Sequence, residues 1–221
     1  MSITFPNGDI YVGVILDDKM SRGKLHMING DVFEGDFSEN TMSSGILTRA
    51  DGEIFTGTFL DNMMSLGELQ MINGNLFVGE FSNNMMVSGV MTQANGDIFQ
   101  GTFLNNMFSN GTIRFRNLDR FSGDFVNNLM ASGRLRLANG DVFVGTLSEN
   151  KMSVGQLNFS NGDTFVGNFE NGKMSSGTLT YSNGDQFSGN FINNIRAVGA
   201  MQLAFEILPA RNIDRKELRG E

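Results

Sequence analysis

Residues 161–182 read NGDTFVGNFENGKMSSGTLTYS, and this stretch decides the fold because its 22-residue pattern occurs nine times without a gap. The nine copies begin at Asn7, Asn29, Asp51, Asn73, Asn95, Asn117, Asn139, Asn161 and Asn183. A fixed period of about 20 to 50 residues is typical of stacked-repeat proteins. The sequence therefore predicts one elongated body in which each repeat contacts its neighbours.

Each repeat has the pattern of a β-hairpin. Asn161-Gly162 predicts a type I′ turn, since both residues tolerate the positive φ that this turn requires. Residues 163–169 have a period of two that places Phe165, Gly167 and Phe169 on one face of a predicted strand. A polar link, residues 170–176, leads to a second predicted strand over residues 177–182. The sequence predicts an all-β fold, an elongated, twisted and trough-shaped single antiparallel sheet formed by a meander of hairpins.

Glycine and phenylalanine follow the repeat. Of the 28 glycines, 26 fall in three columns, and of the 20 phenylalanines, 15 fall in two columns of the same predicted sheet face. We expect the glycine between the two aromatic columns to leave room for a ring to lie flat on the backbone. The predicted aromatic face consists of Tyr11, Phe33, Phe37, Phe55, Phe59, Phe77, Phe81, Phe99, Phe103, Phe121, Phe125, Phe143, Phe165, Phe169, Phe187 and Phe191.

A methionine recurs in the predicted link, as at Met174. We expect these side chains to fold over the end of the aromatic face as adaptable filler. The alternative is a methionine-rich binding surface.

The repeats set the expected boundaries. Residues 2–6 match the second strand of a repeat, so the repeat array is predicted over residues 1–204, and we expect no catalytic domain before it. Residues 205–221 leave the pattern. They are predicted to form a C-terminal cap or tail, in which Asn212 could cap a short charged helix over residues 213–219.

The repeat resembles a known family. Residues 165–173, Phe-Val-Gly-Asn-Phe-Glu-Asn-Gly-Lys, are similar to the Tyr-x-Gly-x-Trp-x-x-Gly-Lys opening of the MORN (membrane occupation and recognition nexus) repeat. The resemblance covers about residues 2–204. Phenylalanine replaces the tyrosine and tryptophan, asparagine usually replaces the link glycine, and the period is one residue shorter than usual. The resemblance implies a sheet of hairpins that serves as a scaffold, dimerisation surface or peptide-binding trough.

Composition narrows the function classes. The formal net charge of −8 opposes nucleic-acid binding and disfavours, without excluding, contact with anionic membranes. No cysteine is present, so disulfides and thiol chemistry are excluded. Neither a signal peptide nor an apolar run of about 18 residues is visible. The expected location is intracellular, cytoplasmic or cytoskeleton-associated.

Catalytic and metal-binding groups do not converge in the repeat. His26 is the single histidine, and no nucleophile elbow, phosphate loop or zinc motif occurs. An acid follows most Asn-Gly pairs, as in Asp163, which raises the question of calcium. Equivalent acids would lie about 9–10 Å apart, too far to share an ion, and they more simply stabilise the turn. We therefore predict no catalytic, cofactor-binding or metal-binding residue and no enzyme activity.

Repeats five and six depart from the pattern. They contain five of the sixteen basic residues, which parity places on the polar face of three adjacent strands as a candidate partner-binding site: Arg114, Arg116, Arg120, Arg134 and Arg136. Leu118 replaces the turn glycine, and Phe108 replaces the methionine. Guanidinium groups pair with carboxylate and phosphate, so the patch could bind an acidic or phosphorylated segment. The alternative is an ordinary polar surface whose arginines pair locally with Asp119 and Asp124.

The leading prediction is a non-enzymatic scaffold that binds protein partners through the aromatic trough, the arginines or the strand edges. Open edges also favour self-association. One alternative is a membrane-associated module that contacts anionic headgroups. The other is an accessory subunit of a larger complex whose catalysis lies on another chain.

Overall fold

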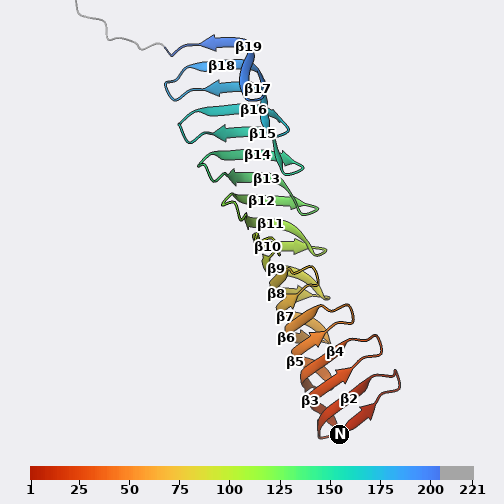
Figure 1. Ribbon diagram of the computed structural model, residues 1–221. Helices are drawn as coiled ribbons and strands as arrows, with labels where there is room; N and C mark the ends of the chain where they lie inside the picture. The colour runs from red at the N-terminus through yellow and green to blue at the C-terminus, as the bar shows by residue number, and fades with distance from the viewer. Residues whose placement is uncertain (205–221) are drawn as a thin grey trace, which may run out of the picture.

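Nineteen strands form one sheet in the computed structural model, which describes residues 1–204 (Figure 1). Strands that follow one another in the chain pair antiparallel from β1 to β19, and no helix occurs among these residues. The predicted all-β fold, a single antiparallel meander of hairpin repeats, is confirmed. The predicted C-terminal cap or tail and its short helix lie outside the described residues.

Each repeat supplies two strands. The first strands are β2 (Ile10–Leu16), β4 (Val32–Ser38), β6 (Ile54–Leu60), β8 (Leu76–Ser82), β10 (Ile98–Leu104), β12 (Arg120–Val126), β14 (Val142–Ser148), β16 (Thr164–Glu170) and β18 (Gln186–Ile192). The second strands, preceded by β1 (Ser2–Thr4), are β3 (Lys19–His26), β5 (Thr41–Thr48), β7 (Met63–Gln70), β9 (Met85–Thr92), β11 (Met107–Arg114), β13 (Leu129–Arg136), β15 (Lys151–Asn158), β17 (Lys173–Thr180) and β19 (Ile195–Gln202).

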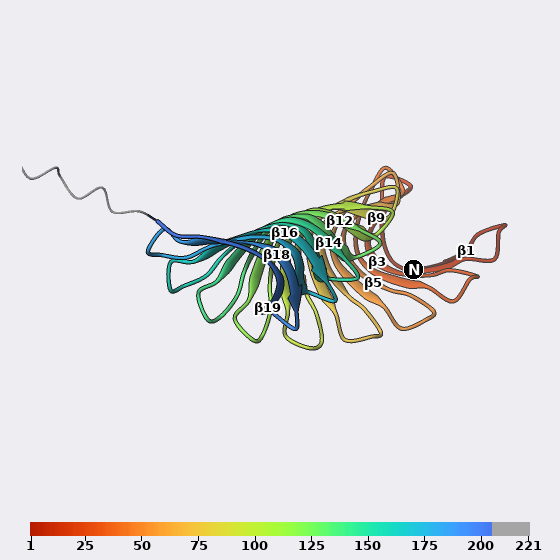
Figure 2. The same ribbon diagram turned by 90° about the horizontal axis from the view of Figure 1, so that it is seen from above.

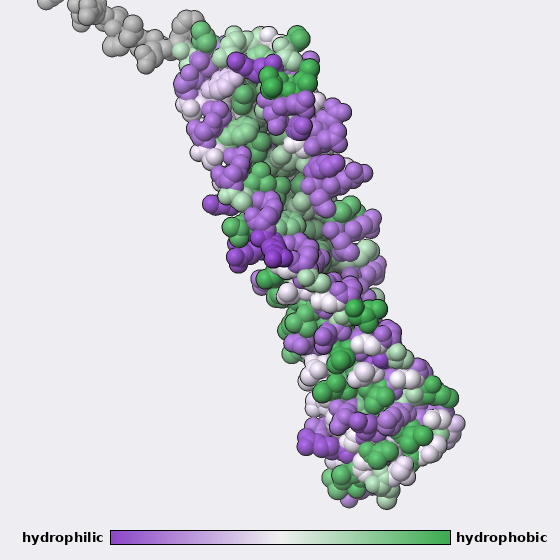
Figure 3. All heavy atoms as spheres, in the orientation of Figure 1, coloured by the Kyte–Doolittle hydropathy of each residue, from purple (hydrophilic) through white to green (hydrophobic). Residues whose placement is uncertain are grey.

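The sheet is long and strongly twisted. Seen from above, the hairpins fan around the long axis (Figure 2), as the right-handed twist of strands requires. A band of apolar side chains runs between hydrophilic margins on the visible face of the C-terminal half (Figure 3). The molecule is therefore an elongated trough with an apolar floor.

Aromatic rings form the core of this trough. Eight of the nine residues in the fifth column of the repeat, Tyr11 to Phe165, are fully buried. Their rings contact neighbours edge to face; Phe55, for example, lies 5.1 Å from Phe59 and 5.2 Å from Phe81 between ring centroids. Such contacts contribute about 0.5–1.5 kcal/mol beyond the area they bury. All sixteen residues of the predicted aromatic face lie in this core.

A line of glycines supports the rings. Gly167 lies opposite Gly177, which lies opposite Gly189 across the next strand pair. A Cβ atom on Gly167 would stand 2.8 Å from Cζ of Phe165 and 2.2 Å from the carbonyl oxygen of Ser176. The ring of Phe165 therefore lies against bare backbone on its own strand and on the strand beside it.

The Asn-Gly turn differs from the prediction. Gly162 has a φ of +94°, but Asn161 is not in the left-handed region. The amide of Gly162 donates to the carbonyl of Phe159, and the amide of Phe159 donates to the carbonyl of Asp163. These bonds close a three-residue loop, a type I turn followed by a glycine bulge. The predicted type I′ turn at Asn161-Gly162 is wrong.

The type I′ turn lies instead in the predicted link. Asn171 and Gly172 both have positive φ, 52° and 78°, and they alone separate β16 from β17. Other repeats use Asp, Glu or Asn here, often as an Asn pair, since short polar side chains tolerate this region. The second strand thus begins at Lys173 rather than Gly177, and the polar link of residues 170–176 does not exist.

The methionines pack on the aromatic face as expected, but from a bulged strand and not from a link. The register of β16 and β17 shifts between Asn168 and Phe169, and Met174 lies opposite Phe169. The extra residue, Ser175, changes which side chains face inward. Met174 is a strand residue that is buried against the aromatic face.

Candidate functional site

The face opposite the aromatic rings is open to solvent. In β12, the side chains of Ser122 and Asp124 point away from buried Phe121 and Phe125. Residues 120–124 of β12 pair in unbroken register with both neighbouring strands, so residues on this face form rows across the sheet. Four of the five candidate arginines lie here.

Three arginines occupy one row. Arg114 at the end of β11 lies opposite Arg120 of β12, and Arg120 lies opposite Arg136 of β13. Arg134 lies in the adjacent row, opposite Ser122. All four are exposed. We call Arg114, Arg120 and Arg136 the arginine row.

Arg116 does not belong to this surface. The chain leaves the sheet at Phe115, whose amide and carbonyl close the next loop through bonds with Asp119 and Leu118. Arg116 lies inside that loop, and its Cδ is the atom nearest to a Cβ placed on Gly96 in the equivalent loop of the preceding repeat. The parity argument that placed it on the polar face is wrong, because parity holds only while the strand continues.

Within residues 1–204, no carboxylate forms an ion pair with an arginine of the arginine row. The ion pairs found there all involve other basic residues. Asp119 accepts bonds from Asn117 and the amide of Ala138. Asp124 accepts bonds from Asn110 and Ser132, and these bonds lower its pKa. The alternative of local pairing with Asp119 and Asp124 is wrong.

Elsewhere on the same face, an arginine forms a cross-strand ion pair with an acid. Arg22 of β3 lies opposite Asp36 of β4 and makes two bonds to its carboxylate, of 2.7 and 3.0 Å. The arginine row has the equivalent cross-strand geometry, with arginine in place of the acid. Like charges directly opposite each other destabilise a sheet. The row therefore carries an unbalanced positive charge on an acidic chain.

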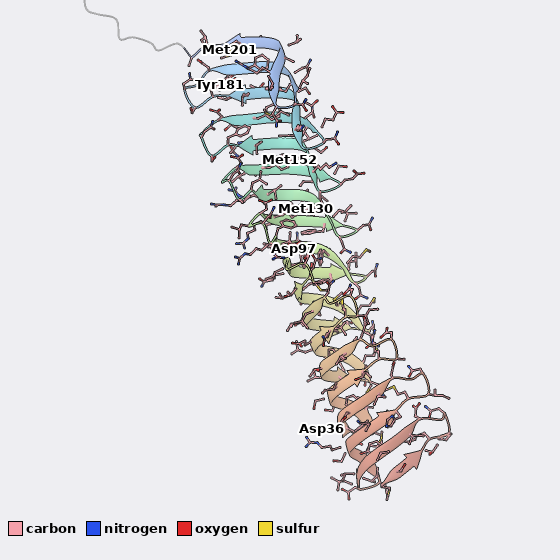
Figure 4. All side chains as sticks on the ribbon, in the orientation of Figure 1. Asp36, Asp97, Met130, Met152, Tyr181 and Met201 are labelled. Carbon is pink, nitrogen blue, oxygen red and sulfur yellow. The ribbon has the colours of Figure 1, made fainter. Side chains whose placement is uncertain are left out.

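The trough on the other face has an asparagine rim. In seven of the nine type I′ turns the second residue is an asparagine whose Oδ1 accepts the backbone N–H of the residue twenty positions earlier, as Asn194 does from Met174 and Asn150 from Met130. Gly172 interrupts this series, so Met152 has no side-chain acceptor there. Met152, labelled with Met130 in Figure 4, is only half-buried. It lines a cavity of about 410 Å³ with Phe159 and other residues.

An acidic rim runs along the opposite margin of the trough. Oδ1 of Asp163 accepts the backbone N–H of Ser182 in the next loop, and its Oδ2 accepts a bond from Asn161. The same hydrogen bond from the next loop to Oδ1 recurs at Asp9, Asp31, Asp97, Asp119, Asp141 and Asp185. Both carboxylate oxygens are engaged, which is the turn-stabilising role expected of these acids. Residues 1–204 contain no group of three acidic or histidine side chains suited to a metal ion.

Comparison with known proteins identifies the repeat. The family model for the MORN repeat matches residues 77–98, 121–142 and 165–186. The chain contains MORN repeats. No curated protein matches its sequence.

Solved structures share the fold of the sheet. The wild-type TCP10 domain of Danio rerio CPAP matches with a TM-score of 0.51 at 13% identity, over 89% of this chain and all of that one. The same domain in complex with a peptide of Danio rerio STIL matches with a TM-score of 0.44 at 14% identity, over 85% and 81% of the two chains. At these identities the likeness shows a common fold alone.

The two ends of the sheet differ from each other. β1 has three residues and covers only the first part of β2, from Ile10 to Val12. No described strand pairs with the outer edge of β19, and Ile195 and Val198 on it are largely exposed.

The described residues include no helix that could cross a membrane.

Two features of the site appear in the sequence as departures from the repeat, but periodicity does not give their structural meaning. Leu118 has a φ of +74°, a conformation that glycine adopts in the other loops. The sequence signal was the missing Asn-Gly pair next to Arg120. The break in the asparagine rim was also visible, because Gly172 is the single glycine among the second residues of these turns. Its meaning depends on the bulge and on the turn type, which the sequence does not give.

Proposed function

We propose that this chain is a non-enzymatic MORN-repeat scaffold that binds a protein partner through its open sheet face, centred on the arginine row. The main support is the register that sets Arg114, Arg120 and Arg136 directly opposite one another without a carboxylate between them. Three uncompensated cations in one row weaken the sheet locally, so an acidic partner relieves repulsion that the free protein bears.

The remaining repeated groups are used by the fold. Aromatic rings fill the trough, glycines make room for them, and Asp and Asn side chains link one hairpin to the next. His26, the single histidine, is exposed and makes no side-chain hydrogen bond within residues 1–204, which favours a binding role over catalysis.

A capture experiment with matched variants tests this function. The variant has serine at Arg114, Arg120, Arg134 and Arg136, and the control is Arg116→Ser, which removes a charge from the loop beside the patch. Each protein is used to capture partners from cytosolic and cytoskeletal fractions of source cells. We expect a partner set that is lost from the four-arginine variant and kept by the control.

The other outcomes separate the alternatives. An unchanged partner set would move the binding site to the aromatic trough or the strand edges. Loss of binding to anionic vesicles in the four-arginine variant, with no protein partner, would favour the membrane-associated module. Turnover by the purified chain would contradict the scaffold proposal, whereas turnover only in a captured complex would favour the accessory subunit.

We also propose self-association through the outer edge of β19. Within residues 1–204, the outer edge of β19 has no strand partner, and an exposed edge strand with apolar side chains is a ready template for another strand. Val198→Lys should reduce the molar mass measured by light scattering if this edge joins two copies. Equal masses for the wild type and the variant would contradict it.

A further inference from the structure

The arginine row is the centre of a longer line of residues. Ile98 of β10 lies opposite Arg114, and Val142 of β14 lies opposite Arg136. The line therefore runs apolar, basic, basic, basic, apolar across five strands. Ile98 is 40% exposed and Val142 is half-buried, so both ends of the line are accessible.

The backbone around this line cannot accept another strand. β11, β12 and β13 are interior strands, and each is paired along both edges. An extended segment lying across them would find no ladder partners for its own N–H and C=O groups. An α-helix bonds its backbone internally and presents only side chains.

The spacing of the line also fits a helix. Adjacent strands lie about 4.8 Å apart, so the five positions span about 19 Å and the arginine row about 10 Å. An α-helix rises about 1.5 Å per residue, so one strand spacing corresponds to about three residues. Positions i, i+3, i+7, i+10 and i+14 share one helix face and span about 21 Å. Three alternate side chains of an extended segment would span about 13 Å, longer than the arginine row.

We propose that the arginine row binds an acidic amphipathic helix that lies across β10–β14. Its contact face carries an apolar residue, three acidic residues and a second apolar residue at the heptad-like spacing given above. The acids pair with Arg114, Arg120 and Arg136, and the apolar residues contact Ile98 and Val142. This inference rests on the proposed function and specifies the partner of that site.

Synthetic peptides test the shape of the partner. The probe is a labelled 18-residue helical peptide with Leu, Glu, Glu, Glu and Leu at positions 2, 5, 9, 12 and 16 and alanine, serine or glutamine elsewhere. The first control has the same composition in scrambled order, and the second has the same contact residues but a proline in the middle that breaks the helix. Binding is followed by fluorescence anisotropy with the full chain.

The designed helix should bind at least tenfold more tightly than either control peptide. Arg120→Ser, at the centre of the row, should weaken its binding at least tenfold, whereas Arg116→Ser should change it less than twofold. Raising the salt concentration should weaken binding to the wild type, because the contact is made by ion pairs. Thermal melts of both variants establish that they are folded.

Other results would overturn the inference in distinguishable ways. Equal binding of the helix and the proline control, both lost in Arg120→Ser, would overturn the helical partner and leave the acidic docking site in place. Binding that Arg120→Ser does not weaken would overturn both the helical partner and the arginine row as its site. Tighter binding to phosphatidylserine vesicles than to the helix, also lost in Arg120→Ser, would overturn a protein partner in favour of a lipid surface.

Discussion

The backbone N–H of Met152 faces the turn that contains Gly172, and there it lacks the side-chain acceptor that its counterparts in seven other repeats have. Asn150 and Asn194, on either side of this gap, accept the equivalent bonds at 2.8 Å. Gly172 already has a φ of +78°, a region that asparagine tolerates. The nearest atom to a Cβ placed on it, Cβ of Lys151, is 3.7 Å away. The turn therefore has room for the missing side chain.

Gly172→Asn should stabilise the protein by about 0.5–1.5 kcal/mol, the usual net contribution of one hydrogen bond. The measurement is the midpoint of urea unfolding. Gly172→Ala is the matched control, since it adds a Cβ without an acceptor and should not stabilise. A midpoint for Gly172→Asn no higher than that of Gly172→Ala would contradict the rim bond.

Leu118→Gly should stabilise the loop beside the arginine row. A non-glycine residue at positive φ costs about 1–2 kcal/mol, and the higher chain entropy of glycine offsets about 0.5–1 kcal/mol of that gain. We therefore expect a net gain of about 0.5–1 kcal/mol, measured as a higher melting temperature.

Leu118→Ala serves as the control because it keeps the Cβ and the strained conformation. A rise in melting temperature for the alanine variant as large as that for the glycine variant would assign the effect to the exposed leucine side chain instead.

Gly79→Val should disrupt the core, whereas Ser82→Val on the same strand should have little effect. A Cβ on Gly79 would stand 2.2 Å from the carbonyl oxygen of Ser88 and 2.6 Å from Cζ of Phe77, so both the backbone and a buried ring would have to move. Ser82 ends β8 on the exposed face. We expect a loss of at least about 3 kcal/mol for Gly79→Val, at the upper end of the cost of overpacking. Equal melting temperatures for the two variants would contradict the assignment of faces.

The repeated columns made most of the fold predictable. Phe165, Gly167 and Phe169 recur with the two-residue period of a strand, and the same physical demand acts in every repeat. A buried ring needs bare backbone beneath it, and a meander without proline in its ladders keeps its hydrogen bonds. The strand order, the aromatic core and the open polar face follow from these constraints.

The turns could not be assigned from sequence because both links carry residues that tolerate positive φ. Asn161-Gly162 and Asn171-Gly172 are the same dipeptide, but only the second forms a type I′ turn. The bulge at Ser175 shifts the alternation by one residue, and this shift brings Met174 into the core. Arg116 was misplaced for a related reason, since the sequence does not show that the strand ends two residues before it.

The pairing of Arg22 with Asp36 predicts how stability changes with pH. The hydrogen bond from Arg22 lowers the pKa of the Asp36 carboxyl below its ordinary value. The folded protein therefore favours the ionised carboxylate, and its contribution is complete above the unfolded pKa of about 3.9. That contribution is lost as the pH falls through the folded pKa, because protonation then costs the folded state more than the unfolded state.

Asp36→Asn should therefore lower the melting temperature at pH 7, and the difference from the wild type should shrink below about pH 4. Asp124→Asn should follow the same direction, since bonds from Asn110 and Ser132 lower the pKa of Asp124 without a cation. Added salt distinguishes the two, because it screens the charge pair of Asp36 more than the neutral bonds of Asp124. A difference between wild type and Asp36→Asn that is the same at pH 7 and pH 3 would contradict the assigned role of the ion pair.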